Sequence, residues 1–159
     1  MAGFTLAEIL EATGGHLLQR GMSEYCSSIS TDTRSLEKGA LFIPLTGENF
    51  NGHRFINKAV EKGAAAVLIS EPADVSAFAA VSVIAVENTL HALEALARFH
   101  RLRFSIPVIA VTGSNGKTTT KDMISSVLKR KYRVCHTKKN FNNEIGLSQT
   151  LLSLTSEDE

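Results

Sequence analysis

The chain has 159 residues, of which 43% are hydrophobic and 21% charged, and its formal net charge is +1 at pH 7. This balance is typical of a globular protein with one ordinary domain or two small ones. A net charge so close to zero argues against a nucleic-acid binder that neutralises many phosphates. No apolar run approaches the roughly 20 residues that span a bilayer, so we expect no membrane insertion.

The first half of the chain has the pattern of a small α/β unit. Thr5-Leu6-Ala7-Glu8 fits a capping box ahead of a short helix that ends at Gly14. A second helix is expected to begin near His53 and to end at Gly63. Four runs rich in apolar residues predict strands: residues 25–30, 40–45, 64–69 and 81–86.

The sequence changes character near residue 87. Apolar residues recur at helical spacing between residues 90 and 99, and Asn88 or Thr89 is the expected N-cap. Residues 108–111 form a continuous apolar run, which is typical of a buried strand in a parallel sheet, and residues 133–136 predict a second strand. We therefore predict an α/β fold with two domains, residues 1–86 and residues 87–159.

The two cysteines, Cys26 and Cys135, lie far apart in the sequence and have no metal-ligand spacing. The N-terminus lacks the basic stretch and long apolar segment of a signal peptide. Because disulfides are rare in reducing compartments, we expect two free thiols in a cytoplasmic protein.

A glycine-rich segment, Gly113-Ser114-Asn115-Gly116-Lys117-Thr118, separates the first of these later strands from a helical run. Glycines allow a sharp turn, and successive backbone N–H groups and the helix N-terminus can surround a phosphate. In such loops the lysine reaches the β- and γ-phosphates, and the next hydroxyl ligates Mg²⁺. We therefore predict ATP binding, with Lys117 as the catalytic residue and Thr118 as the metal ligand. The predicted phosphate-binding residues are Gly113, Ser114, Asn115, Gly116, Lys117, Thr118 and Thr119.

This phosphate-loop motif is the shorter one. The longer form, Gly-x-x-x-x-Gly-Lys, needs a glycine at position 111, where Val111 stands. The alternative interpretation is a glycine turn before a helix with an exposed lysine. The flanking strand and helix favour phosphate binding.

A second group of polar residues lies in the first unit. Hydroxyl side chains, an arginine and a glycine turn suit a diphosphate and a uracil ring. The alternative is an Asx- or Ser/Thr-turn with a surface arginine, followed by a glycine turn that caps a helix at Asn51. The candidate substrate-binding residues are Ser30, Thr33, Arg34, Thr46, Gly47, Asn51 and His53.

Taken in order, these segments resemble the Mur ligase family, which builds the peptide stem of bacterial cell-wall precursors. That family carries Ser-Asp-(Ser/Thr)-Arg, Phe-x-x-Leu-x-Gly and (Asp/Asn)-Gly-His-x-Phe in its first domain, and Thr-Gly-x-x-Gly-Lys-(Thr/Ser) in its central domain. The resemblance covers nearly the whole chain. It departs at Thr31, which stands between Ser30 and Asp32, and at Asn51, where the family more often has aspartate.

The resemblance implies a reaction. The first domain would bind a UDP-linked sugar peptide, and the central domain would transfer the γ-phosphoryl group of ATP to the peptide carboxylate. An amine would then attack the acyl phosphate and form an amide. Residues 140–147 and 150–152 look most like the member that adds D-alanyl-D-alanine to a UDP-N-acetylmuramoyl-tripeptide. Asn142 and Asn143 are further candidate substrate-binding residues, with a hydrogen-bonded turn as the alternative.

The family has three domains and a chain roughly three times as long. We therefore expect this sequence to be a fragment that lacks the later metal ligands and the C-terminal domain, without ligase activity by itself. Two other functions stay open: a ligase of the same family that adds a different residue, and a regulatory module that binds ATP.

Overall fold

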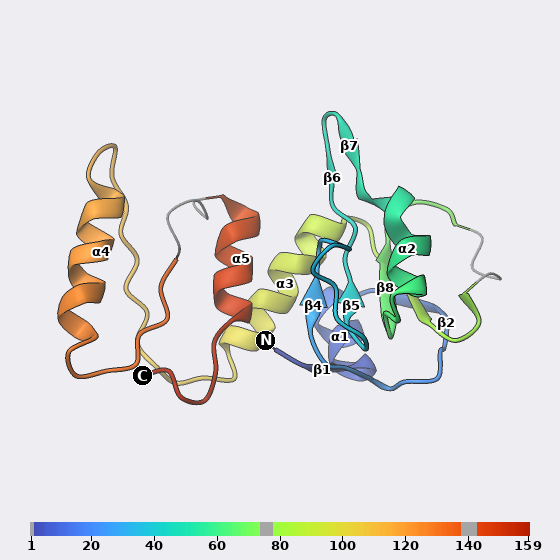
Figure 1. Ribbon diagram of the computed structural model, residues 1–159, viewed down its shortest axis with the longest axis horizontal. Coiled ribbons are helices and arrows are strands. Elements are labelled where there is room, and N and C mark those ends of the chain that lie inside the picture. Colours follow the sequence, from blue (N-terminus) through green and yellow to red (C-terminus); the bar gives the residue numbers. More distant parts are fainter. Residues whose placement is uncertain (1, 74–77, 138–142) are drawn as a thin grey trace.

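The computed structural model describes residues 2–73, 78–137 and 143–159. Its centre is a five-stranded sheet in which β4, β5, β8 and β9 are parallel and β2 runs antiparallel beside β9 (Figure 1). The mixed sheet with its covering helices confirms the predicted α/β class. The strands, in spatial order, are β2 (His16–Gln19), β9 (Ser82–Ala85), β8 (Ala66–Ile69), β5 (Leu41–Phe42) and β4 (Ile29–Ser30).

Helices cover both faces of this sheet because its strand residues alternate between two hydrophobic cores. Leu41 and Ile84 face a first core with α1 (Leu6–Thr13) and α3 (Thr89–Arg101). Phe42 faces a second core. On that side lie the 3₁₀ helix η1 (Gly52–Phe55) and α2 (Ile56–Glu61).

Two small β structures lie outside the main sheet. β1 (Phe4–Thr5) pairs with β3 (Tyr25–Cys26), and β6 (Thr46–Gly47) forms a hairpin with β7 (Phe50–Asn51). The predicted strand at residues 25–30 is therefore two short strands that belong to different sheets.

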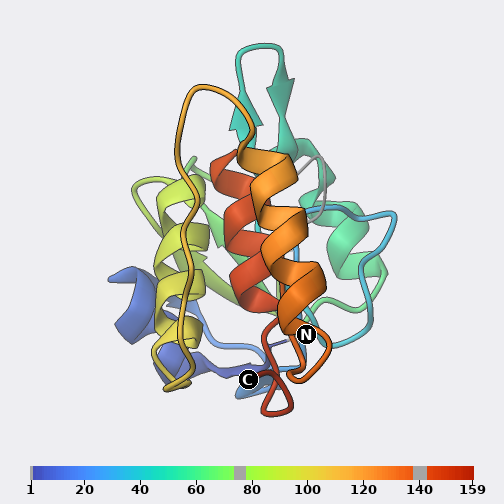
Figure 2. The same ribbon diagram turned by 90° about the vertical axis from the view of Figure 1, so that its left-hand side faces the viewer.

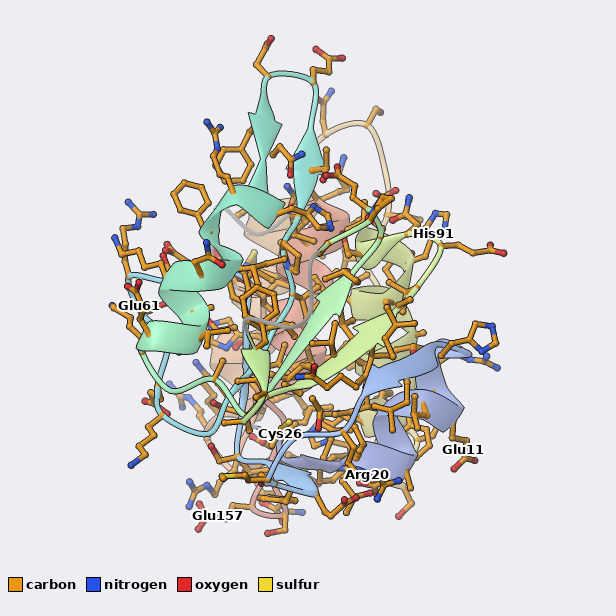
Figure 3. All side chains as sticks on the ribbon, turned by 90° about the vertical axis from the view of Figure 1, so that its right-hand side faces the viewer. Glu11, Arg20, Cys26, Glu61, His91 and Glu157 are labelled. Carbon is orange, nitrogen blue, oxygen red and sulfur yellow. The ribbon has the colours of Figure 1, made fainter. Side chains whose placement is uncertain are left out.

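The predicted helix ends are confirmed in detail. The Thr5 side chain and the Glu8 side chain form the capping box of α1, and Gly14 ends this helix with a φ of 64°. Asn88 caps α3 by accepting hydrogen bonds from two backbone N–H groups. Charged side chains at the rim of this unit, such as Glu11 and Glu61, point outward (Figure 3).

The two strands predicted near the phosphate loop are wrong. Residues 108–111 and 133–136 are irregular segments that run beside α4 (Lys117–Leu128) (Figure 1). Val108 and Ile109 are about 60% exposed. Within the described residues, neither segment has the neighbouring strands that a parallel sheet needs. Because a strand depends on such partners for its hydrogen bonds, apolar sequence alone does not form one.

The last helix, α5 (Glu144–Leu152), was not predicted, and it packs on the first unit. Leu152 enters the first core, and its carbonyl accepts a hydrogen bond from the Ala2 N–H at 3.2 Å. Figures 1 and 2 show α5 between α3 and α4. The domain boundary at residues 86–87 stays a prediction; the packing shows that Leu93 and Leu96 of α3 belong to the first core.

Candidate functional site

The predicted residues of the first unit gather at the carboxyl edge of the parallel strands. Ser30 is the last residue of β4, and the loop with Thr33 and Arg34 follows it directly. The hairpin with Thr46 and Gly47 follows β5 after a three-residue connection. Ligands of open α/β sheets bind outside this edge, so the location fits a binding site.

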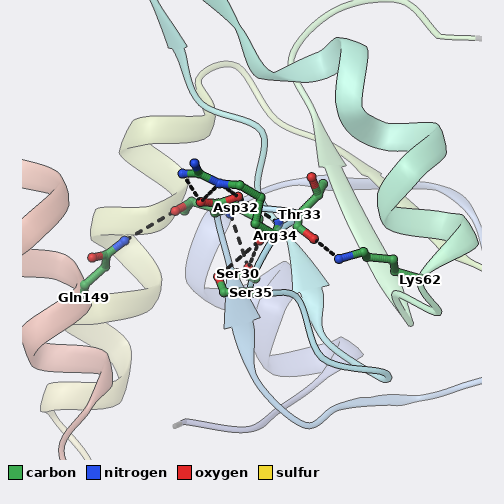
Figure 4. Close-up of polar contacts among 8 residues, drawn as sticks. Ser30, Asp32, Thr33, Arg34, Ser35, Lys62 and Gln149 are labelled. Carbon is green, nitrogen blue, oxygen red and sulfur yellow. Dashed lines mark hydrogen bonds and ion pairs between the residues drawn. The ribbon is translucent and has the colours of Figure 1, made fainter.

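Arg34 makes its ion pair within the loop. Its Nε lies 3.0 and 2.9 Å from the two carboxylate oxygens of Asp32, and its Nη2 lies 2.6 Å from one of them (Figure 4). Hydrogen bonds from the Arg34 side chain and backbone hold the pKa of the Asp32 carboxyl below its usual range. The guanidinium stays accessible, because the Arg34 side chain is 86% exposed.

The same loop is held by two other elements. Lys62, at the end of α2, donates a hydrogen bond through Nζ to the Thr33 carbonyl at 2.6 Å. Gln149 of α5 donates to the Thr31 hydroxyl at 3.4 Å. Thr33 itself is buried, so it supports the loop, whereas Arg34 faces outward.

His53 connects the start of η1 to the end of β8. Its Nε2 accepts a hydrogen bond from the Ser70 backbone N–H at 3.0 Å, so this nitrogen carries no proton. The neutral ring donates through Nδ1 to the Asn51 side-chain oxygen at 3.0 Å. The Asn51 amide in turn donates to the Glu71 carboxylate at 2.9 and 3.1 Å. Both ring nitrogens of His53 are therefore used inside the protein.

The phosphate loop has the conformation that its glycines allow. Gly113 and Gly116 have φ values of 146° and 76°, which side-chain-bearing residues rarely adopt. Gly116 is the N-cap of α4, and no side chain caps this helix. Its first backbone N–H groups are therefore available to an anion. Lys117 folds back over the turn and donates to the Gly113 carbonyl through Nζ.

The hydroxyl-bearing residues after Lys117 lie on the outer side of α4. Thr118 and Thr119 line a hollow of about 520 Å³ together with Asp122 and Met123. Within the described residues, no three His, Cys, Asp or Glu side chains come together to hold a metal ion.

The segment after α4 returns toward the phosphate loop. Lys121, one turn beyond Lys117, donates to the Thr137 carbonyl at 2.6 Å. Asn143 caps α5 by accepting a hydrogen bond from the Gly146 N–H at 2.9 Å. Asn142 lies outside the described residues.

Both cysteines are free, as predicted. Cys135 is partly buried. Cys26 is buried, and its burial raises the pKa of the thiol to about 12.

Figures 1 and 2 show the phosphate loop, the hairpin β6–β7 and the N-terminus of α5 on the same side of the molecule, the upper one in both views. An anionic nucleotide at the loop and a second ligand at the sheet edge would thus lie on a common side. Sequence reasoning missed three residues that build this end: Asp32, Lys62 and Gln149. Asp32 lay within a segment already singled out, whereas the other two gave no local indication.

No helix among the described residues is both long enough and apolar enough to cross a membrane.

Comparison with known proteins gives consistent matches. The profile of the Mur ligase family, catalytic domain, matches residues 26–101, and that of the Mur ligase middle domain matches residues 111–159.

Curated relatives share substantial identity with this chain. UDP-N-acetylmuramoyl-tripeptide–D-alanyl-D-alanine ligase of Bacillus subtilis is 50% identical over 135 residues, which cover 82% of this chain and 28% of the relative. The enzyme of the same name from Escherichia coli is 36% identical over 157 residues, covering 99% of this chain and 33% of the relative. The chain thus spans about a third of the length of the relatives it matches.

Solved structures agree with the sequence matches. MurF from Acinetobacter baumannii superposes with a TM-score of 0.89 at 34% identity, covering 99% of this chain and 34% of that one. MurF ligase from Thermotoga maritima in complex with ADP superposes with a TM-score of 0.73 at 33% identity, covering 82% of this chain and 30% of that one.

Proposed function

Because this chain belongs to the Mur ligase family, we propose that it supplies the UDP-sugar-peptide site and the ATP phosphate site of an amide ligase. The full reaction would join D-alanyl-D-alanine to a UDP-N-acetylmuramoyl-tripeptide, as the names of its relatives state for those enzymes. The observation that carries this proposal is the glycine turn at residues 113–116, with an uncapped helix behind it and Lys117 folded over it.

Each part of the turn has a role in binding ATP. The backbone N–H groups of Gly113, Ser114, Asn115 and Gly116 would surround the phosphates, because no bulky side chain obstructs them. The N–H groups at Lys117, Thr118 and Thr119 start α4 and would add the positive end of the helix dipole.

Lys117 is the residue that we propose as catalytic. Its ammonium group would leave the Gly113 carbonyl and contact the β- and γ-phosphates. There it would reduce the repulsion between the anionic peptide carboxylate and the anionic phosphate. When bound, ATP would supply the phosphoryl group that makes the carboxylate oxygen a good leaving group.

Mg²⁺ fits the same loop through the Thr118 hydroxyl. A hydroxyl is a hard oxygen ligand of the kind that Mg²⁺ prefers, so Thr118 would hold the ion. Mg²⁺ would neutralise charge that develops on the phosphates. Thr118 lies one residue after Lys117 in the first turn of α4, so both side chains would start beside bound phosphates.

The sheet edge is proposed to hold the UDP part of the substrate. Arg34, Thr46 and Gly47 are exposed there and would contact the ligand directly. The other first-unit candidates would shape the loops through their hydrogen bonds within the protein, namely Ser30, Thr33, Asn51 and His53. Asn143, the N-cap of α5, would lie beside the peptide end of the substrate. Asn142, outside the described residues, stays a candidate for substrate binding. We also propose that the protein acts in the cytoplasm, in keeping with its free thiols.

Isothermal titration tests the phosphate site. The purified chain should bind ADP with Mg²⁺, and Lys117→Ala should weaken binding about tenfold or more, the size of one lost charge-assisted contact. Lys129→Ala is the matched control, because Lys129 lies at the other end of the same helix. Equal ADP affinity in the wild type and Lys117→Ala would contradict the assignment.

Titration with UDP-N-acetylmuramoyl-tripeptide tests the sheet edge separately. The wild type should bind it, and Arg34→Ala should weaken the binding because a phosphate contact is lost. Binding of ADP without any binding of the UDP compound would favour an ATP-binding module over a ligase.

A further inference from the structure

The Asp32 carboxylate accepts more hydrogen bonds than a surface ion pair requires. Besides the Nε and Nη2 groups of Arg34, the Arg34 backbone N–H donates to its Oδ1 at 2.8 Å. One carboxylate therefore fixes both the backbone and the side chain of the same arginine. Arg34 in return has its planar group held at one edge.

The backbone beneath this carboxylate is itself fixed. The Ser30 hydroxyl donates to the Asp32 carbonyl at 2.9 Å, and the Ser35 N–H donates to the same carbonyl at 3.2 Å. Lys62 holds the next carbonyl, that of Thr33, from α2 (Figure 4). Because strand β4 and helix α2 anchor the loop, Asp32 has a defined position relative to the sheet.

The guanidinium of Arg34 has one edge that Asp32 does not occupy. Asp32 occupies the edge formed by Nε and Nη2. The opposite edge, formed by Nη1 and the second N–H of Nη2, makes no hydrogen bond to the described residues, and the side chain is 86% exposed. That edge has the fork that matches two oxygens of one phosphate.

We propose that Asp32 is a positioning residue, which holds Arg34 so that its free edge meets the diphosphate of the UDP-linked substrate. This inference rests on the proposed function. It places an acidic residue, Asp32, next to the anionic diphosphate. The opposite possibility is that Asp32 competes with the ligand for Arg34. The two ideas predict opposite signs when the carboxylate is removed.

Titration of the 159-residue chain with UDP distinguishes them. Positioning predicts that Asp32→Ala weakens UDP binding about fivefold, the size of one hydrogen bond held in place. Competition, or simple repulsion between Asp32 and the anion, predicts tighter binding of UDP by this variant. Asp32→Asn should lie between the wild type and Asp32→Ala, because an amide oxygen still accepts from the Arg34 N–H groups.

Two comparisons separate positioning from a structural defect. Uridine, which lacks phosphates, should bind the wild type and Asp32→Ala equally, and the melting temperature should hardly change because exposed ion pairs contribute little. The double variant Asp32→Ala/Arg34→Ala should bind UDP no more weakly than Arg34→Ala alone, since Asp32 acts through Arg34. Additive losses would overturn the proposal.

Glu37→Ala is the matched control. Glu37 is an exposed acid in the same connection, and its side chain makes no hydrogen bond or ion pair within the described residues. Its removal should leave UDP affinity unchanged or slightly higher. If Arg34→Ala weakens UDP binding but Asp32→Ala does not, only the positioning role fails. If the wild type does not bind UDP at all, the proposed sheet-edge site fails, and this role fails with it.

Discussion

The first unit and the phosphate-loop region differ in how they use apolar residues. In the first unit, Leu41, Ile84 and Leu93 have no exposed surface and pack between sheet and helices. In the phosphate-loop region, residues 105–137, Ile109 is 60% exposed and Val127 is 68% exposed. Within the described residues, only the first region has a sheet against which its helices pack.

The difference shows which parts of a fold are locally determined. Helix α4 forms because its hydrogen bonds lie within one segment and its first residues follow a glycine turn. Residues 108–111 have strand-like side chains, yet their backbone N–H groups make no hydrogen bond to the described part of the chain. A helix satisfies its own backbone, whereas a strand depends on others.

Hydrogen exchange should give the largest contrast. Backbone N–H groups of β8 and β9 should exchange only through global unfolding, at least about a thousandfold slower than unprotected amides. Those of residues 108–111 should exchange at nearly the unprotected rate, because no hydrogen bond from the described residues holds them. Mass spectrometry of peptic fragments measures both. Strong protection at residues 108–111 would mean that this segment is a strand in solution.

Matched isoleucine substitutions should give the next largest contrast. Ile84→Ala removes a fully buried side chain from β9 and should lower the free energy of unfolding by about 3 kcal/mol. Ile109→Ala makes the same chemical change at an exposed position and should cost less than about 0.5 kcal/mol. Urea titration compares them. Similar losses at both positions would show that the phosphate-loop region has a core of its own.

His100 makes the stability of the first unit sensitive to pH. Its Nε2 donates to the Leu154 carbonyl at 2.9 Å, and Nδ1 lies 3.4 Å from the Arg103 guanidinium. Burial lowers the pKa of His100 below its ordinary value of 6.5, and the positive charges of Arg103 and the N-terminus add to this. Glu8 pairs with Arg103 from α1, at 2.8 Å.

The sign of the pH effect follows from this direction. Below pH 6.5 the unfolded chain takes up the proton before the folded chain does, so stability is lost as the pH falls. His100→Phe should cost about 1 kcal/mol at pH 7.5, since the Leu154 carbonyl loses its donor. The variant should also lose less stability than the wild type between pH 7.5 and 5.5. Urea titration of both proteins at both pH values measures this. An equal loss of unfolding free energy in the wild type and the variant would refute the role of His100.

Val127→Lys should have the smallest effect. Val127 is 68% exposed on α4, and lysine has a higher helix propensity than valine. The free energy of unfolding should change by less than about 0.5 kcal/mol. A loss above about 1 kcal/mol in urea titration would mean that this face of α4 is covered, and sedimentation would then show whether a second copy covers it.

The sequence predicted the elements whose determinants are local. The capping box at Thr5, the cap at Asn88 and the glycine ends of the helices all act within a few residues. Helix α5 was missed because its buried positions include Gly146 and Ser148 while Leu147 is exposed, so no apolar stripe identifies it. Strand β2 was missed because its burial comes from β9, which follows more than 60 residues later.

The candidate site also has parts that depend on one local segment and parts that depend on residues distant in the sequence. The glycine turn and Lys117 were predictable because a phosphate loop is one continuous segment. The contacts from Lys62 and Gln149 to the loop at residues 30–35 were not predictable, since these residues are about 30 and 120 positions away, and such separations leave no local pattern.

Helix α5 packs against the first core, so the chain returns to the unit in which it begins. The stretch from Leu102 to Asn143 leaves the body after α3 and comes back to it at α5, so both of its ends are attached to one support. A protease that cuts once within this stretch would leave two fragments that stay associated through α3 and α5. The phosphate loop would thus stay joined to the first core on both sides, through α3 on one and α5 on the other.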